Sequence, residues 1–444
     1  MEEAHLELKR VLGRKELMSA ALGQIIGAGI FSLLPAAIGI AGKAASLSFL
    51  IAACITLFGL VPRIFVNGTI RTNGGNYTHL AFLGERRLAG SFLIIHVLTN
   101  LSLSMYALSF AQYLVASVEG LNVKMVAFSI LTIMVILNLI GVKSTAKVQN
   151  ILVVLLVIAL IIFCIFGVPK VNVNYFLEKP FMNHGLAGVL NAAALLTFAT
   201  GGAATITNYS AEAKNPTKDL PVVLIVSTVG VALIYGVMAV VTTGILPLDM
   251  VANQPLTVIA AEILPRPLYV FFIVGGAMLA LITTLNSQLG ACTKPILQGC
   301  KDGWFPKKWG EVNEKYRTPH YLILFFYVIG LLPIVFGISI TGISSTVVFG
   351  SRIIEICIAL TLLRLPKVVP NEWKKSRFYV SDGKLRLGTA LSFASALLAT
   401  YLTVRTMTYE GAIFNLLVLF LAIGFGYFTD RYRSVNMQVS YEAQ

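Results

Sequence analysis

Two glycine-rich stretches are the parts of this sequence best suited to bind a small charged molecule. In the first, residues 23–31, Gly27 and Gly29 lie one residue apart within a long apolar run. The second, residues 198–204, contains two adjacent glycines within another apolar run. Because glycine in a helix interior costs about 1 kcal/mol relative to alanine, we expect each run to form a helix that is interrupted at its glycines.

An interrupted helix offers the groups that a zwitterion needs. The N–H groups at the start of its second half carry partial positive charge and suit a carboxylate, whereas the carbonyl groups that end its first half suit an ammonium group or a cation. The alternative is that these small residues only let two helices pack closely. Two interrupted helices five apolar runs apart favour a binding site between them, because an unwound backbone survives in lipid only where it lines a cavity or is buried in protein.

The composition indicates a polytopic membrane protein. Of the 444 residues, 57% are hydrophobic and 12% are charged, and the charged share is about half of that in soluble domains. Separate apolar runs of about 20 residues predict α-helical spans rather than a β-barrel. The twelve predicted spans, numbered in chain order, are 17–41, 44–66, 88–117, 123–141, 147–168, 187–206, 220–246, 267–291, 320–337, 346–363, 388–404 and 411–428.

Lys and Arg residues are distributed unequally between the two sides of these spans. Of the 34 in the chain, 27 lie in loops or at adjoining span ends on the side of the termini, with Arg63 counted in the loop after span 2. Six lie in loops on the other side, and Arg352 lies within a span. Since cytoplasmic loops carry the excess of Lys and Arg, we expect an integral protein of the plasma (inner) membrane with both termini in the cytoplasm. These loops also explain the net charge of +14, so we expect a lipid bilayer and no nucleic acid as a partner.

Four motifs resemble those of the amino acid–polyamine–organocation (APC) superfamily of amino acid permeases. Residues 27–31 (GAGIF) resemble G-[SA]-G-[IV]-F in span 1, and residues 74–77 (GGNY) resemble G-G-x-Y after span 2. Residues 211–221 (AEAKNPTKDLP) resemble A-E-x-x-K-N-P-x-[RK]-x-x-P after span 6. Residues 301–306 (KDGWFP), with the Thr-Pro pair at 318–319, resemble the family's A-x-D-G-x-x-P…T-P stretch after span 8.

The resemblance implies an all-α fold like that of the transporter LeuT. Spans 1–5 (residues 17–168) and spans 6–10 (187–363) would form two inverted repeats, with helices 1 and 6 discontinuous and spans 11 and 12 (388–428) peripheral. Residues 1–16 and 429–444 would be cytoplasmic segments. Spans 1, 2, 6 and 7 would move as a bundle against spans 3, 4, 8 and 9.

The resemblance also implies an α-amino acid as substrate and assigns residues to it. The N–H groups of Gly27, Ala28 and Gly29 would hold the carboxylate. The carbonyl groups of Ile25, Phe198 and Ala199 would hold the ammonium group, with the Phe198 ring as a lid and Gly201 in the second break. On span 3, which borders the substrate in the resembled fold, the candidates are Asn100 and Tyr106.

Two positions depart from the family pattern. The family often has an acidic residue where this chain has Ala204, and an aromatic residue where it has Thr200. A pocket without a carboxylate at that position is poorly suited to cationic substrates. We therefore expect a neutral, hydrophobic amino acid.

The coupling ion is predicted from spans 5 and 8. Relatives that couple to protons or exchange substrates often have a lysine in span 5, and the corresponding residue here is Leu156. The stretch Ala280-x-x-Thr283-Thr284 in span 8 resembles the sodium-site pattern of LeuT-like symporters. The proposed ligands are two hydroxyl and three carbonyl oxygens, which suit a hard cation; they come from Gly23, Ile26, Ala280, Thr283 and Thr284.

Other energy sources remain open, because threonine hydroxyls in membrane helices often bond to carbonyls of their own helix. Proton-coupled transport or ion-independent exchange is the alternative to sodium symport. In span 10, Arg352 and Glu355 lie three residues apart on one face. Charges within a span mark function by default, so we expect this pair to form a gate, together with Phe198, or a proton-sensitive network. The alternative is an inert structural pair.

The remaining function classes are disfavoured. No Asp lies within a predicted span, and no HExxH, P-loop or Gly-x-Ser-x-Gly motif is present, so we expect no enzyme and no cofactor beyond a coupling Na⁺. A non-transporting amino acid sensor is the alternative of another class. No cysteine lies in a predicted outer loop to link an accessory subunit, and we expect no obligatory protein partner.

Overall fold

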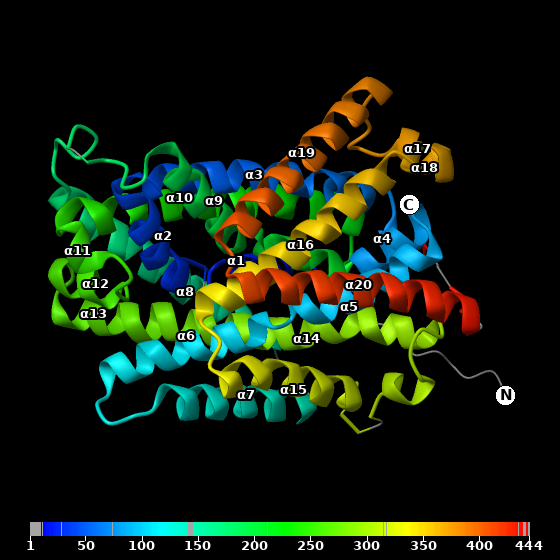
Figure 1. The fold of residues 1–444 in the computed structure, drawn as a ribbon, viewed down its shortest axis with the longest axis horizontal. Coiled ribbons are helices and arrows are strands. Elements are labelled where there is room, and N and C mark those ends of the chain that lie inside the picture. The colour runs from blue at the N-terminus through cyan, green and yellow to red at the C-terminus, as the bar shows by residue number, and fades with distance from the viewer. Residues whose placement is uncertain are drawn as a thin grey trace.

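Apolar helices make up most of the computed structural model (Figure 1). It describes the chain except residues 1–9, 11, 28, 73, 141–144, 179, 211, 314, 317, 434, 438–440 and 443–444. Within the described chain, ten helical stretches are long and apolar enough to cross a membrane. One of them, Arg14–Asn67, has 54 residues and covers the first two predicted spans. The all-α membrane fold is confirmed, whereas the number of twelve spans stays a prediction.

The predicted spans correspond to single helices or to consecutive helical segments. Those of the first five spans are α1 (Arg14–Ile25), the π-helix η1 (Gly29–Leu33), α2 (Leu34–Ala41), α3 (Ala45–Asn67), α5 (Arg86–Thr99), α6 (Ser102–Ser117), α7 (Val123–Ile140) and α8 (Thr145–Gly167). Those of the last seven are α9 (Gly185–Gly201), the 3₁₀-helix η4 (Gly202–Tyr209), α10 (Pro216–Ile245), α13 (Arg266–Phe271), the π-helix η5 (Phe272–Met278), α14 (Leu279–Lys301), α15 (His320–Phe336), α16 (Ile340–Leu362), α19 (Asp382–Thr406) and α20 (Tyr409–Tyr432).

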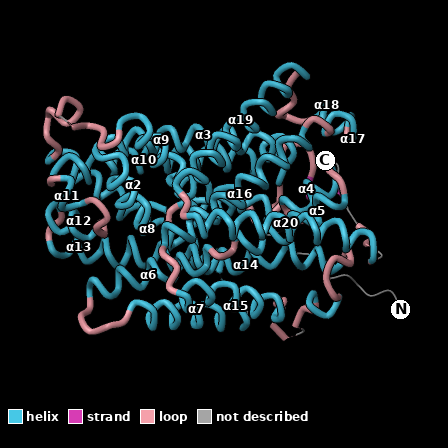
Figure 2. The backbone as a smooth tube through the Cα atoms, in the orientation of Figure 1, coloured by secondary structure: helices cyan, strands magenta, loops and turns pink. Residues whose placement is uncertain are grey.

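Shorter elements lie in the connections. They are η2 (Gly42–Ala44), α4 (Asn76–Leu83), η3 (Val168–Lys170), α11 (Leu248–Val251), α12 (Thr257–Ile263), η6 (Lys307–Gly310), α17 (Leu365–Val368) and α18 (Pro370–Lys375). Strands β1 (Arg71–Thr72) and β2 (Tyr441–Glu442) pair in antiparallel fashion. Figure 2 shows that most connections gather at the two ends of the helices.

Both glycine-rich stretches interrupt their helices, in different ways. In span 1, α1 ends at Ile25, and Ile26 leaves the helical region with φ −84° and ψ 96°. Helical hydrogen bonding resumes at Gly29, and Ala28 lies outside the described residues. In span 6, α9 ends at Gly201 and continues directly as η4. The second break is therefore a change from α to 3₁₀ geometry rather than an unwound segment.

Spans 3 and 8, which the sequence predicts as uninterrupted, also change geometry. In span 3 the Asn100 side chain donates to the His96 carbonyl (2.7 Å), which is the acceptor that the Asn100 backbone N–H would use in an α-helix. That N–H bonds instead to the Val97 carbonyl, and α5 ends there. In span 8 the π-helix η5 lies directly before α14. The junction of α5 and α6 lies beside the cavity described below, which Thr99 and Ser102 line.

The outward faces of the peripheral helices are strongly apolar. On α8 the exposed side chains include Ile151, Val154, Ile158, Ile161 and Ile165, and similar rows lie on α7, α19 and α20. Contiguous exposed apolar surface of this kind marks contact with another apolar phase. These faces are suited to lipid.

The described ends of the chain lie at the same end of the helices. Leu12 pairs with the backbone around Ala213, after η4, and the Asn436 N–H donates to the Asp302 carbonyl, after α14. Glu212 and Lys294 in turn join those two regions through an ion pair. Which side of the membrane this end faces stays a prediction.

Candidate functional site

The interrupted regions of spans 1 and 6 lie in direct backbone contact. A Cβ atom placed on Gly29 would lie 2.4 Å from Ala199 Cα, and one placed on Gly202 would lie 2.4 Å from the Gln24 carbonyl oxygen. Atoms cannot approach so closely, so side chains at either position would force the two segments apart. These glycines therefore allow the two helices to pack closely. The close packing brings together the two breaks that were predicted to bind substrate.

Four of the five residues predicted to bind sodium meet at one hydroxyl group. Thr284 Oγ1 lies 2.7 Å from the Gly23 carbonyl oxygen, 3.3 Å from that of Ile26 and 2.8 Å from that of Ala280. Thr283 Oγ1 lies 2.9 Å from the same Ala280 oxygen. The cluster joins the end of α1 to α14, and its three carbonyl and two hydroxyl oxygens are the hard ligands that a small cation prefers.

Gly27 leaves room for this cluster. A Cβ atom at this position would lie 2.4 Å from Thr284 Oγ1. Both threonine hydroxyls also bond to a carbonyl of their own helix, as threonines in membrane helices often do. The geometry is thus compatible with either a cation site or a structural cross-link between spans 1 and 8.

The Ile25 carbonyl, predicted to hold a substrate ammonium group, already has a partner. The hydroxyl of Tyr235, on α10, donates to it at 3.0 Å, and Tyr235 is fully buried. Sequence analysis missed Tyr235. Tyr235 is the only aromatic residue of predicted span 7, and this was the available signal, since a buried phenol needs a hydrogen-bond partner.

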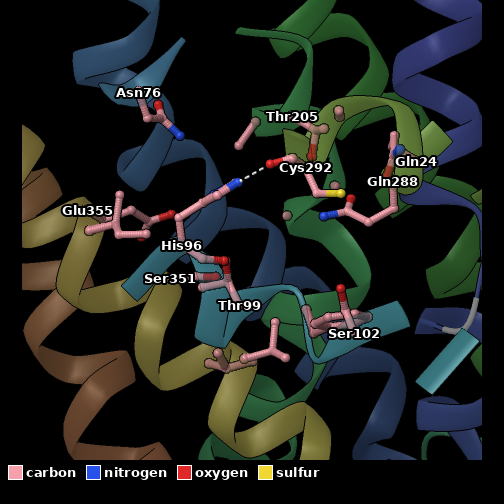
Figure 3. A pocket seen from close by; sticks show the side chains of 18 of the residues that line it. Gln24, Asn76, His96, Thr99, Ser102, Thr205, Gln288, Cys292, Ser351 and Glu355 are labelled. Atoms are coloured by element: carbon pink, nitrogen blue, oxygen red, sulfur yellow. Dashed lines mark hydrogen bonds between the residues drawn. The ribbon is translucent and has the colours of Figure 1, made fainter. Parts of the chain in front are cut away.

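A cavity of about 140 Å³ lies beside the breaks. Phe198, Gly201, Tyr106, Arg352 and Glu355 among the predicted residues line it, whereas Ile25, Gly27, Gly29, Ala199 and Asn100 do not. The rings of Tyr106 and Phe198 lie 6.2 Å apart. Figure 3 shows the cavity between Gln24, Gln288 and Cys292 on one side and Ser351 and Glu355 on the other.

A chain of hydrogen bonds connects span 3 to span 8 along the cavity. His96 Nε2 lies 2.9 Å from the Cys292 carbonyl oxygen, the contact drawn in Figure 3. Gln288 donates to Asn100 Oδ1 at 2.6 Å, and Asn100 Nδ2 lies 3.3 Å from His96 Nε2. Asn100 is fully buried, so it positions Gln288 in the cavity wall instead of lining the cavity itself.

The Arg352–Glu355 pair belongs to a larger charged cluster. The two side chains form the predicted ion pair, and Arg63 Nη1 of α3 lies 3.6 Å from the second Glu355 oxygen. Arg63 also donates to Asn76 (3.0 Å) and to the Gly59 carbonyl (3.3 Å). All three charged side chains are at least 93% buried and line the cavity.

Arg63 corrects the sequence analysis, which counted it with the loop after span 2. It lies in the last two turns of α3, which continues to Asn67. Gly59, one turn before Arg63, makes room for the cluster, because a Cβ there would lie 2.8 Å from Glu355 Oε2. A glycine four residues before an arginine near the end of an apolar run was the available signal.

The positions that depart from the family pattern are uncharged. Thr200 is buried and its hydroxyl lies 2.7 Å from that of Thr56 on α3. Ala204 lines the cavity and brings no carboxylate to it. Leu156, at the position where some relatives carry a lysine, is fully buried in α8.

The loop motifs meet one another beyond the cavity. Tyr77, in the GGNY motif, donates to Asp302 of the KDGWFP motif at 2.5 Å, and Trp304 Nε1 donates to the Tyr77 hydroxyl at 3.0 Å. Glu212, in the motif after η4, pairs with Lys294 at 2.5 Å. The motifs therefore tie together the loops at the end of the helices where both termini lie.

A buried histidine lies in the same region, on α4. His79 is fully buried, and neither ring nitrogen has a hydrogen-bond partner in the part of the chain that the structure describes. Burial, followed by the nearby Arg63 guanidinium, lowers the pKa of His79 to about 3. The side chain is therefore neutral at physiological pH.

The chain is similar to known transporters over most of its length. Residues 12–436 match the family described as Amino acid permease. The Branched-chain amino acid permease BcaP of Bacillus subtilis (strain 168) is 27% identical over 392 residues, which are 82% of each chain. The Methylthioribose transporter of the same organism is 26% identical over 335 residues, or 70% of this chain and 72% of that protein. Cationic amino acid transporter 3, mitochondrial, of Arabidopsis thaliana is 23% identical over 393 residues, or 83% of this chain and 64% of that protein.

The family match covers both interrupted helices, the cavity between spans 1, 3, 6, 8 and 10, and all four sequence motifs. It is also in keeping with the apolar helices that are long enough to cross a membrane. This protein belongs to the amino acid permease family of integral membrane transporters.

Proposed function

We propose that this permease is a secondary active transporter that moves a neutral, hydrophobic amino acid by alternating access, together with Na⁺. The observation that carries the proposal is the backbone contact between the two breaks beside the cavity, at Gly29–Ala199 and Gly202–Gln24. Helix ends at the middle of a membrane supply the partial charges that bind a zwitterion.

The lining of the cavity supports a neutral substrate of modest size. Its apolar part includes Phe198, Tyr106, Val347 and Val348, and Ala204 brings no negative charge. A cavity of about 150 Å³ holds a molecule the size of benzene, which is comparable with a short aliphatic side chain. The relative named for branched-chain substrates makes leucine, isoleucine and valine the first candidates.

The oxygens around Thr284 support sodium as the coupling ion. Ligands from α1 and α14 converge there, so a cation would hold the broken helix of span 1 against span 8. Binding of an ion that favours one arrangement of these spans couples its gradient to transport, since a ligand shifts an equilibrium only through its different affinity for the two states.

Uptake into proteoliposomes tests the proposal. Purified protein would be reconstituted and given a labelled amino acid mixture with either Na⁺ or choline outside. We expect uptake of branched-chain amino acids that requires Na⁺ and accumulates them against a gradient. Sodium-independent uptake would discard the ion assignment and favour exchange or proton coupling, and a lack of any amino acid uptake would refute the proposed transport.

Thr284→Ala tests the ion site within the same assay. Loss of the hydroxyl should raise the Na⁺ concentration for half-maximal uptake at least about tenfold, which corresponds to about 1.4 kcal/mol. Thr284→Ser keeps the hydroxyl and should retain most of the sodium affinity. An unchanged sodium dependence in the alanine variant would contradict the assignment.

A further inference from the structure

Two side chains in the cavity wall carry hydrogen-bond donors without acceptors. Arg352 Nε and Gln24 Nε2 are buried and have no partner among the residues that the structure describes. Arg352 is 3% exposed and Gln24 is 5% exposed, and both line the cavity. Buried donors without partners are rare because each costs about 1–3 kcal/mol. A ligand that accepts hydrogen bonds would remove this cost.

The charges in the wall point to a negatively charged ligand. Arg63, Arg352 and Glu355 together carry one excess positive charge. The guanidinium of Arg63 is engaged with Glu355, Asn76 and the Gly59 carbonyl. Arg352 gives only Nη1 to Glu355, which leaves the rest of its planar group available. The cluster therefore carries excess positive charge, and its buried donor without a partner, Nε, lies on Arg352.

Both residues lie beside the break in span 6. A Cβ placed on Gly201 would lie 3.9 Å from Arg352 Nη2, and one placed on the next residue, Gly202, would lie 2.4 Å from the Gln24 carbonyl oxygen. Arg352 thus extends from α16 towards the end of α9, where Gln24 of α1 also lies. The position is next to Phe198, which lines the same cavity.

We propose that Arg352, with Gln24, forms a carboxylate subsite in the cavity, separate from the backbone N–H groups after the break in span 1. The inference rests on the proposed function, because the occupant is the carboxylate of the transported amino acid. Guanidinium groups bind carboxylates through two parallel hydrogen bonds. Apolar neighbours such as Val347 and Val348 favour an organic acid over an inorganic anion.

The subsite gives the substrate a second place to bind. Its carboxylate leaves the helix end of span 1 and passes to Arg352, which lies on the side of the cavity where Arg63 and Glu355 join α3 to α16. The same excess positive charge disfavours substrates with a cationic side chain.

Equilibrium binding to the purified protein tests this subsite. The probes are leucine, 4-methyl-2-oxopentanoate, which has the carboxylate without the ammonium group, and 3-methylbutan-1-amine, which has the ammonium group without the carboxylate. Wild-type protein should bind the first two. Arg352→Gln should weaken binding of the oxo acid by about tenfold or more, since charge-assisted hydrogen bonds are lost.

Arg63→Gln is the matched comparison, because it removes the same charge from a residue whose Nε and Nη1 donors are already engaged. It should weaken oxo-acid binding clearly less than Arg352→Gln. Equal losses in the two variants would show an effect of net charge only and would overturn the subsite, as would undiminished binding in Arg352→Gln. Gln24→Leu changes no charge and should also weaken binding of the oxo acid. This variant replaces Arg352→Gln in the test if Arg352→Gln does not fold.

Two further outcomes separate the subsite from the proposed function. Arg352-dependent binding of the oxo acid without any binding of leucine would support the subsite and refute neutral amino acid transport. Glutamate could also compete with the oxo acid for binding to the wild type but not to Arg352→Gln. That result would support the subsite, with a side-chain carboxylate as its occupant. Failure of the oxo acid to bind wild-type protein that binds leucine would overturn the subsite alone.

Discussion

At the scale of single residues, adjacent glycines in span 6 have different surroundings. Gly202 lies against the Gln24 backbone, whereas the nearest atom to a Cβ at Gly201 is Arg352 Nη2 at 3.9 Å. We expect Gly202→Ala to destabilise the protein by about 1–3 kcal/mol, the usual cost of overpacking. Gly201→Ala should change stability by about 0.5 kcal/mol or less. Thermal unfolding in detergent measures both, and equal effects would contradict the close contact of spans 1 and 6.

The buried His79 predicts how the stability of the protein depends on pH. Its pKa is about 3 in the folded protein, against about 6.5 for an unperturbed histidine. Because the unfolded state binds the proton more readily, stability falls as pH drops from 6.5 towards 3, and this residue alone removes about 2 kcal/mol between pH 7 and pH 5. His79→Gln should therefore lose less stability over this interval than wild type. The same exchange at the exposed His184 is the control, and an identical loss in His79→Gln and wild type would contradict the buried neutral state.

At the scale of elements, the junction between α5 and α6 depends on Asn100 and its contact with Gln288 of α14. A double-mutant cycle of Asn100→Ala and Gln288→Ala should give a coupling free energy of about 1 kcal/mol. Either single substitution already breaks the hydrogen bond between the two side chains, so the second substitution does not lose it again. Melting of the four proteins in detergent supplies the cycle. Additive effects would show that span 3 and span 8 are not linked through this bond.

The helices show which features of the structure can be predicted from sequence patterns. Apolar runs and glycine pairs predict where the helices lie and that spans 1 and 6 are interrupted, because both properties depend on local composition. They do not predict the changes of geometry in spans 3 and 8. They do not predict the contacts of Arg63, Tyr235 or Asn100, since these depend on which neighbouring helix faces each side chain. Arg63 was counted with the loop after span 2, although the predicted span 44–66 includes it, and its burial depends on contacts with Glu355 of a distant span and with Asn76.

At the scale of the whole molecule, the distribution of Lys and Arg predicts the orientation in the membrane. Val173, 98% exposed between η3 and α9, should face the outside, whereas Lys374 of α18 should face the cytoplasm. In a background without the five native cysteines, Val173→Cys should react with a membrane-impermeant maleimide on intact cells. Lys374→Cys should react only after permeabilisation. The reverse pattern of maleimide labelling would contradict the predicted topology.

The central claim is that an amino acid binds where the broken helices of spans 1 and 6 meet. An experimental structure of the protein with saturating leucine and Na⁺ tests it most directly. We expect ligand density between the backbone after Ile26 and the ring of Phe198, with α1 ending near Ile25. A continuous helix from Arg14 to Ala41, with no ligand density beside Phe198, would contradict the account.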